Sequence, residues 1–196
     1  MNTLAKSSLR SVSLICLTLF PLGPGAKSQT SFPDPPRDLT RVYYISGDSA
    51  FLPLPFEAGV TSLNVFAPAK QDEITRVVLK GPPAGPVIAI NQRPYFYVFV
   101  ADKMDPPPHQ LVRLTNKGSA REFRISVIKG RKGYAPFEID SVKLERRVLE
   151  RLQVETGKGR YIFVNYMQLR PIPLLKPGQY AIIGDSLSDI ATFQVR

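Results

Sequence analysis

Residues 174–183 have the sequence Leu-Leu-Lys-Pro-Gly-Gln-Tyr-Ala-Ile-Ile, and this stretch indicates the fold. Pro177-Gly178 favours a sharp corner, and an apolar run that is typical of a buried strand follows it. In immunoglobulin-like sandwiches, a tyrosine at the start of the penultimate strand turns its hydroxyl back to the preceding corner. We therefore expect Pro177, Gly178 and Tyr180 to form a structural corner. After a polar loop, residues 190–195 provide the final strand that such a fold requires.

Strand signals continue upstream of this corner at intervals of about 8–12 residues, which is typical of a sandwich or barrel. Residues 41–45 and 50–54 flank the turn sequence Ser-Gly-Asp-Ser and predict a hairpin within a possible N-terminal subregion, 41–70. Glycine and proline turn signals separate the later runs of β-branched and aromatic residues. The sequence therefore predicts an all-β, immunoglobulin-like antiparallel sandwich over residues 41–196.

Residues 141–154 allow two interpretations. Val142, Val148, Leu149 and Leu152 have nearly helical spacing, which favours one short helix. Alternatively, a strand ends at Val154 and turns back through Gly-Lys-Gly into a Tyr-Ile-Phe-Val run, as in a hairpin. We favour the strand because the glycine turn and the run that follows it fit a hairpin.

The N-terminus has the layout of a secretory signal. Residues 1–10 carry two basic residues and no acid, residues 11–22 are mostly apolar, and Ala26-Lys27-Ser28 offers small residues for a signal peptidase. The apolar run is shorter than the roughly 20 residues that span a bilayer. We expect a signal peptide over 1–28, a Pro-rich extended leader over 29–40, and no membrane span after cleavage. An uncleaved anchor is the alternative. The expected location is secreted or periplasmic.

The composition excludes several kinds of site. The chain of 196 residues has one Cys and one His, and its 26 Lys and Arg exceed its 16 Asp and Glu, for a net charge of +10. Cleavage after Ser28 would remove three basic residues and the single Cys, which leaves +7. An intramolecular disulfide, a multi-histidine metal site and a Cys-rich zinc site are therefore excluded. We expect neither a metal nor a cofactor.

Several short motifs together resemble a known group of proteins. These motifs are Val42-Tyr43-Tyr44, Asp105-Pro106, Leu111-Val112-Arg113-Leu114, Arg121-Glu122-Phe123, Pro136-Phe137 and Leu175-Lys176-Pro177-Gly178-Gln179-Tyr180. In this order they are similar to uncharacterised bacterial exported β-sandwich proteins that commonly end in a Pro-Gly-Glu-Tyr strand start. Gln179 stands where that group has an acid. The resemblance implies a fold and export, and it transfers no catalytic residue.

The sequence Gly-Asp-Ser-Leu-Ser-Asp at 184–189 resembles the nucleophile block of the GDSL esterases and lipases, in which the serine is the nucleophile. A serine hydroxyl needs a base, and that family supplies it from a later Asp-x-x-His. Only residues 190–196 follow the block here and they contain no His, while His109 lies far upstream after three prolines. We therefore expect a hairpin loop, with His109 exposed and no catalytic residue. A serine esterase that uses Ser186 is the alternative.

The positive charge is concentrated in residues 113–170, where 14 Lys and Arg face six Asp and Glu. The candidate binding residues are Lys129, Arg131, Lys132, Arg146, Arg147, Arg151, Lys158 and Arg160. Tyr161 and Phe163 lie among them, where they suit either this surface or a sandwich core. We expect a non-catalytic binding or structural module of the envelope, whose partner is another envelope protein or an anionic surface polymer rather than nucleic acid. For the basic residues themselves we favour solvated strand faces and edge protection, and binding of an anionic envelope polymer through residues 113–170 is the alternative.

Overall fold

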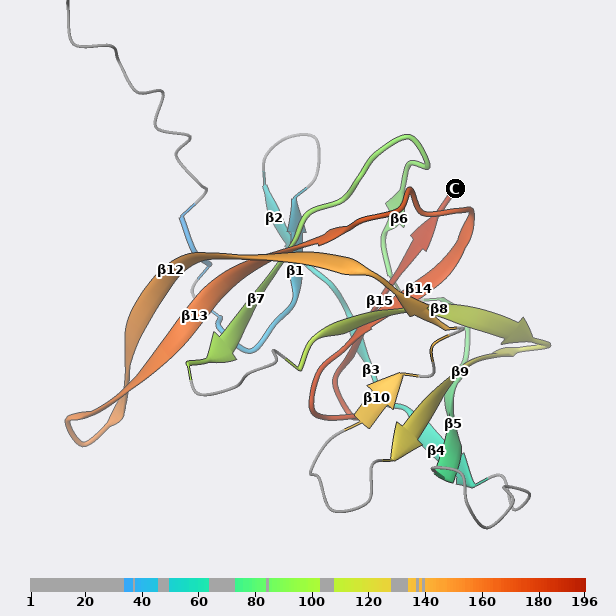
Figure 1. Ribbon diagram of the computed structural model, residues 1–196, viewed down its shortest axis with the longest axis horizontal. Coiled ribbons are helices and arrows are strands. Elements are labelled where there is room, and N and C mark those ends of the chain that lie inside the picture. Colours follow the sequence, from blue (N-terminus) through green and yellow to red (C-terminus); the bar gives the residue numbers. More distant parts are fainter. Residues whose placement is uncertain are drawn as a thin grey trace, which may run out of the picture. The chain divides into compact units, whose positions relative to one another are not determined.

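The computed structural model describes residues 34–36, 38–45, 50–63, 73–83, 85–102, 108–127, 134–136, 138 and 140–196, which belong to a compact unit, Asp34–Arg196 (Figure 1). All regular elements in this part are strands. They are β1 (Tyr43–Ile45), β2 (Phe51–Pro53), β3 (Phe56–Glu57), β4 (Val60–Leu63), β5 (Glu73–Lys80), β6 (Val87–Ile88), β7 (Phe96–Ala101), β8 (Gln110–Lys117), β9 (Ala120–Val127), β10 (Tyr134–Pro136), β11 (Ser141–Val142), β12 (Leu144–Gly157), β13 (Arg160–Pro171), β14 (Gly178–Ile183) and β15 (Ile190–Val195).

The strands form two sheets. The five-stranded sheet has the order β12-β13-β7-β1-β2, and the ten-stranded sheet has the order β3-β15-β14-β8-β9-β5-β4, with β6, β10 and β11 beside it. Among the described strand pairs, only β6 and β15 run parallel. The prediction of an all-β antiparallel sandwich is therefore confirmed at the level of a sandwich or curled half-barrel. Its immunoglobulin-like topology stays a prediction.

The main core lies between the two sheets. Phe96, Val98 and Leu169 of the smaller sheet belong to one buried cluster with Ile182 and Phe193 of the larger sheet. The rings of Phe96 and Phe193 have centroids 4.8 Å apart. Alternate residues of a strand point to the same face of its sheet. Phe96 and Phe193 therefore contact each other between the facing sides of the two sheets.

A second core lies where the larger sheet curls over itself. β8 pairs with β9 only over Thr115–Lys117, and Phe123 and Ile125 of β9 then pack with Ala181 and Ile183 of β14. The other face of β14 belongs to the first core through Tyr180 and Ile182. β14 is thus buried on both faces, which explains its unbroken apolar run.

Residues 141–154 form strands, as we favoured, and not a helix. β12 pairs with β13 along most of its length, with a register shift between Val148 and Glu150. A bulge of this kind adds one residue and shifts the alternation of faces, so Val148, Leu149 and Leu152 acquire an apparently helical spacing. Within the described residues, no helix is long and apolar enough to cross a membrane.

Candidate functional site

The loop between β14 and β15 lines a cleft of 380 Å³. Gly184, Asp185, Ser186 and Asp189 come from this loop. The remaining lining residues are Asp38, Thr40, Arg41, Val42, Phe56, His109 and Ile182. The cleft therefore collects polar groups from three places in the sequence, and it includes the serine and the histidine that the sequence singled out.

His109 is half-buried in this cleft, so the prediction of an exposed loop residue is wrong. Gln110 is in register with Ile183, which brings the imidazole beside Gly184: a methyl group placed on Gly184 would lie 3.7 Å from His109 Nε2. Nδ1 is buried and has no hydrogen-bond partner among the described residues. Burial lowers the pKa of His109 to about 4; Asp185 opposes this shift and Arg146 adds to it. The imidazole is therefore neutral at pH 7.

Ser186 is bonded within its own loop. Its Oγ lies 2.6 Å from Ser188 Oγ and accepts a hydrogen bond from the Ser188 amide at 3.1 Å. Ser188 Oγ in turn donates to Asp189 Oδ2 at 3.2 Å. These are the contacts of a serine-stabilised turn, and among the described residues no hydrogen bond joins Ser186 to His109. No group of three or more metal-ligating side chains occurs in the described part of the chain.

The corner residues lie at the start of β14. The Tyr180 hydroxyl donates to the Lys176 carbonyl at 2.8 Å, and the Tyr180 ring stacks on Phe193 with centroids 5.5 Å apart. Gly178 has a φ of 151°, and Arg113 donates to the Pro177 carbonyl at 3.2 Å. These contacts fix the entry of the chain into β14 between the two cores.

The second candidate site is the projecting part of the β12–β13 hairpin. β13 pairs with β7 only over Val164–Leu169, so residues 153–163 form a two-stranded ribbon, which projects at the left of Figure 1. We call residues 153–163 the ribbon. Its turn, Gly157-Lys158-Gly159, has three consecutive positive φ angles, the conformation that favours glycine.

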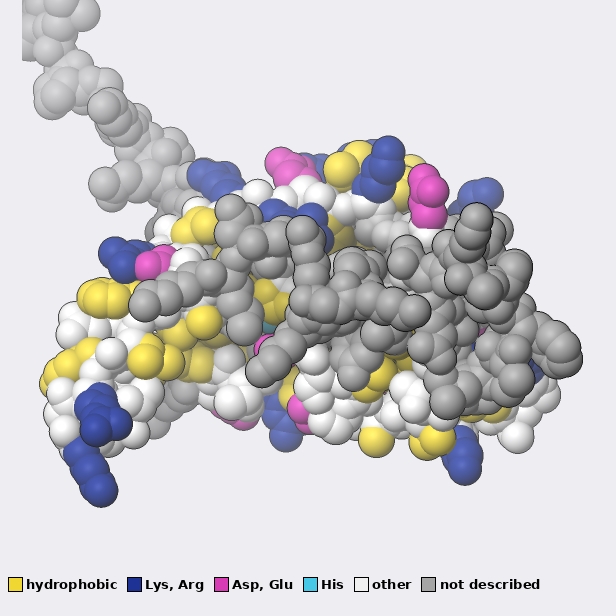
Figure 2. All heavy atoms as spheres, turned by 60° about the horizontal axis from the view of Figure 1, so that its bottom comes forward, with side chains coloured by type: hydrophobic (Ala, Val, Ile, Leu, Met, Phe, Trp, Pro, Cys, Tyr) yellow, Lys and Arg dark blue, Asp and Glu magenta, His cyan; other side chains and the backbone are white. Residues whose placement is uncertain are grey.

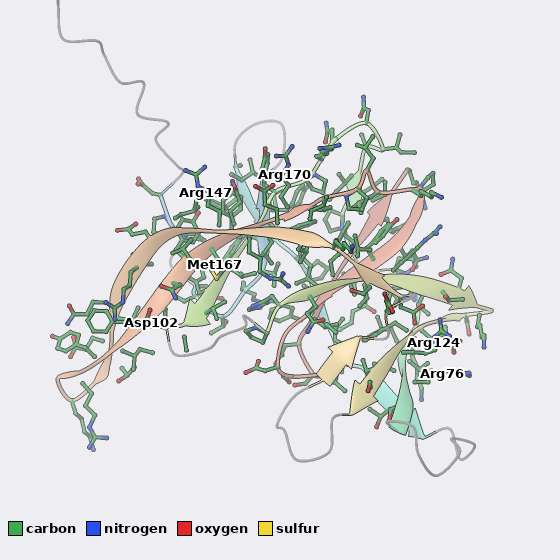
Figure 3. All side chains as sticks on the ribbon, in the orientation of Figure 1. Arg76, Asp102, Arg124, Arg147, Met167 and Arg170 are labelled. Carbon is green, nitrogen blue, oxygen red and sulfur yellow. The ribbon has the colours of Figure 1, made fainter. Side chains whose placement is uncertain are left out.

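Five of the eight predicted basic residues lie on this hairpin. Lys158 and Arg160 are exposed at the ribbon tip, where Figure 2 shows dark blue side chains below yellow hydrophobic ones. Arg151 donates to Asp102, which is labelled in Figure 3, at 2.6 Å, and its guanidinium lies 4.1 Å from the centroid of Phe163. Arg146 donates to the His109 carbonyl at 3.0 Å, and Arg147 is on the same strand, outside the ribbon. Lys129, Arg131 and Lys132 lie outside the described residues.

The ribbon also exposes three consecutive apolar side chains, two of which, Tyr161 and Phe163, suited either a surface or a core from the sequence alone. Tyr161 is 55% exposed, Ile162 46% and Phe163 43%. Consecutive strand residues point to opposite faces, so both faces of the ribbon carry uncovered apolar surface. The local pattern alone could not predict this, because a similar continuous apolar run in β7 is mostly buried.

The chain matches no known protein family, no curated protein and no solved structure.

Proposed function

We propose that this protein is an exported, non-catalytic binding module of the cell envelope, and that the ribbon contacts its partner. The observation that supports this function is the exposed apolar triplet Tyr161–Phe163 behind two cations, Lys158 and Arg160, on a hairpin that extends beyond its sheet. An isolated two-stranded hairpin is only marginally stable in water. Exposed apolar surface on such a hairpin is typical of an interaction site, because a partner that covers it removes that surface from water.

The partner class that fits the tip is an anionic surface polymer. Lys158 and Arg160 bring two positive charges to one turn, and aromatic side chains beside them provide flat apolar contact area. Long cationic side chains at an exposed tip attract a polyanion from several directions. An envelope protein with an acidic, apolar groove is the alternative partner.

Binding to immobilised polyphosphate tests this function. We expect Lys158→Ala/Arg160→Ala to weaken binding about tenfold, and we expect the affinity of the wild-type protein to fall steeply as salt is raised. The matched control is Lys80→Ala/Arg93→Ala, which removes two exposed cations elsewhere. Equal weakening by both double variants, or an affinity that does not depend on salt, would contradict the proposal.

The export part of the proposal has its own test. If residues 1–28 are a signal peptide, the intact mass of the protein recovered from outside the cytoplasm corresponds to a chain that begins at Gln29. The comparison is with the variant Ala26→Arg. This variant should not be cleaved, because signal peptidases need small residues at that site. Recovery of the uncleaved chain in the cytoplasm alone would contradict export.

A second candidate function is a serine hydrolase, and one observation favours it: Ser186 and the neutral His109 line the same cleft. A neutral imidazole can accept a proton from a serine hydroxyl. The bond between Ser186 and Ser188 would have to be exchanged for one to His109. Labelling by a fluorophosphonate that disappears in Ser186→Ala would support the hydrolase, whereas Ser188→Ala serves as the control that keeps the nucleophile.

A further inference from the structure

β12 is an edge strand with a regular central segment. Within the described residues its only strand partner is β13, so one side of its backbone is unpaired. Register shifts lie between Val148 and Glu150 and between Glu155 and Gly157, on either side of the segment Glu150–Glu155. Glu150–Glu155 is therefore the stretch of this edge that can accept a further strand in uninterrupted register.

We propose that this segment pairs antiparallel with the same segment of a second copy of this chain, centred on Gln153. Two edge strands of a symmetric dimer are related by a twofold axis perpendicular to the sheet, so each residue faces one on the same side of the sheet. Centred on Gln153, this pairing places Arg151 opposite the partner's Glu155 and Glu155 opposite the partner's Arg151. The partner's Val154 then faces Leu152. The strand is complementary to itself in charge and in apolarity.

The neighbouring symmetric registers lack this complementarity. A pairing centred on Arg151 places two arginines face to face, and one centred on Glu150 does the same with two glutamates. A pairing centred on Leu152 places Glu150 opposite the partner's Val154. Like charges directly opposite each other destabilise a strand pair, whereas opposite charges and apolar pairs stabilise it. The sequence of β12 therefore disfavours these registers and supports the one centred on Gln153.

The same register extends to the β13 strands. Val154 is in register with Ile162, and Leu152 is in register with Val164. Across the four-stranded sheet of a dimer, one row of side chains therefore has the order Ile162, Val154, the partner's Leu152 and the partner's Val164. Two such apolar rows lie on one face, related by the twofold axis. The dimer thus places Ile162, now 46% exposed, in a continuous apolar row and supports the two-stranded ribbon on its unpaired side.

The existing contact of Arg151 is compatible with this pairing. Arg151 donates to Asp102 through Nη2 and stacks on Phe163, which keeps its guanidinium on the face where the partner's Glu155 would lie. A guanidinium has five N–H donors and can serve two carboxylates. The charged edge, which discourages pairing with unrelated strands, becomes the means of selecting its own copy.

A cysteine placed on the twofold axis tests the register. In a Cys16→Ser background, Gln153→Cys puts two thiols on backbones whose Cα atoms are about 5 Å apart, within disulfide reach. Thr156→Cys on the same exposed edge is the control, because its two copies would be roughly 20 Å apart. We expect mild oxidation to cross-link Gln153→Cys and not Thr156→Cys. Equal cross-linking of both, or of neither, would overturn the proposal.

A charge exchange tests the pairing without a cross-link. Glu155→Arg places Arg opposite the partner's Arg151 at two positions, so we expect the dimer dissociation constant, measured by analytical ultracentrifugation, to rise about tenfold or more. The double variant Arg151→Glu/Glu155→Arg restores opposite charges and should return the constant to within about threefold of the wild-type value. An unchanged constant in Glu155→Arg, no recovery in the double variant, or a wild-type protein that sediments only as a monomer would overturn the proposal. Because these variants keep Lys158 and Arg160, polyphosphate binding is tested separately.

Discussion

Two hairpins of this protein have the same local pairing and opposite surroundings. β14 and β15 pair antiparallel, and so do β12 and β13. Tyr180, Ala181, Ile182 and Ile183 of β14 are at most 2% exposed, whereas β12 contains no residue that is fully buried. The difference follows from position: β14 lies between β8 and β15 with a core on each face, while β12 is at the edge of its sheet. Burial of a strand is thus set by what covers it, and not by its hairpin.

The largest expected contrast is between two phenylalanines. Phe193 of β15 is 1% exposed and contacts the rings of Phe96 and Tyr180. We expect Phe193→Ala to lower the free energy of unfolding by about 3–5 kcal/mol, because it leaves a cavity between the sheets. Phe163→Ala, on the ribbon, should cost less than about 1 kcal/mol. Urea unfolding measures both, and equal losses would show that the ribbon is part of the main core.

A pair of arginines gives the next contrast. Arg121 is 3% exposed and forms a bidentate ion pair with Glu57, which also accepts a hydrogen bond from Thr192 of β15 at 2.5 Å. Arg121→Met removes this bidentate charge partner of the buried carboxylate and should cost about 3 kcal/mol of unfolding free energy. Arg151→Met breaks the exposed pair with Asp102 and should cost less than about 1 kcal/mol.

The double variant Arg121→Met/Glu57→Leu is the control for this contrast. It removes both charges of the buried pair, so it should recover much of the stability that Arg121→Met loses. Failure to recover would mean that Arg121 acts mainly by packing and not through its charge. The same urea titration decides between these results.

His109, which lies beside the loop of the buried β14–β15 hairpin, makes the stability of the protein depend on pH. The pKa of His109 is about 4 in the folded protein, below the ordinary value of 6.5, so the unfolded chain binds the proton more readily. The contribution of His109 to the folding stability is therefore fully present above about pH 6.5, and it is lost as the pH is lowered through about 4. A shift of this size corresponds to an upper bound of about 3 kcal/mol, which solvent at a half-buried ring reduces.

The variant His109→Gln isolates this contribution from that of the carboxylates. Glutamine does not titrate, so we expect the stability of this variant to change less between pH 6.5 and pH 4 than that of the wild-type protein. The difference between the two unfolding curves at each pH reports the histidine alone. Identical pH profiles would show that the imidazole is as solvated in the folded chain as in the unfolded one.

The smallest contrast concerns two hydroxyl groups. Tyr180→Phe removes the hydrogen bond to the Lys176 carbonyl and should cost about 1 kcal/mol of unfolding free energy. Tyr161→Phe, at a ring that is 55% exposed, should change stability by only a few tenths of a kcal/mol, since its hydroxyl lies in water. Thermal unfolding of the two variants in parallel measures the difference. A larger loss in Tyr161→Phe would contradict an exposed ribbon.

Part of this molecule follows from its sequence alone. The alternation of residue types, the Gly-Pro turns and the Pro177-Gly178 corner act over a few residues, so they predicted an all-β fold and the strand nature of 141–154. The exact pattern of β12 was harder to interpret because a bulge shifts its alternation. The basic residues of the hairpin were found from local charge, although three of them lie outside the described residues.

Tertiary structure decided what covers each strand and which distant residues meet. The pairing of β8 with β14 brought His109 beside Gly184 and lowered its pKa. The end of the β7 pairing at Val164 left Tyr161, Ile162 and Phe163 uncovered, although their pattern resembles that of a core strand. Turn and strand preferences arise from sterics within neighbouring residues, whereas burial depends on segments far apart in the chain, which no local pattern specifies.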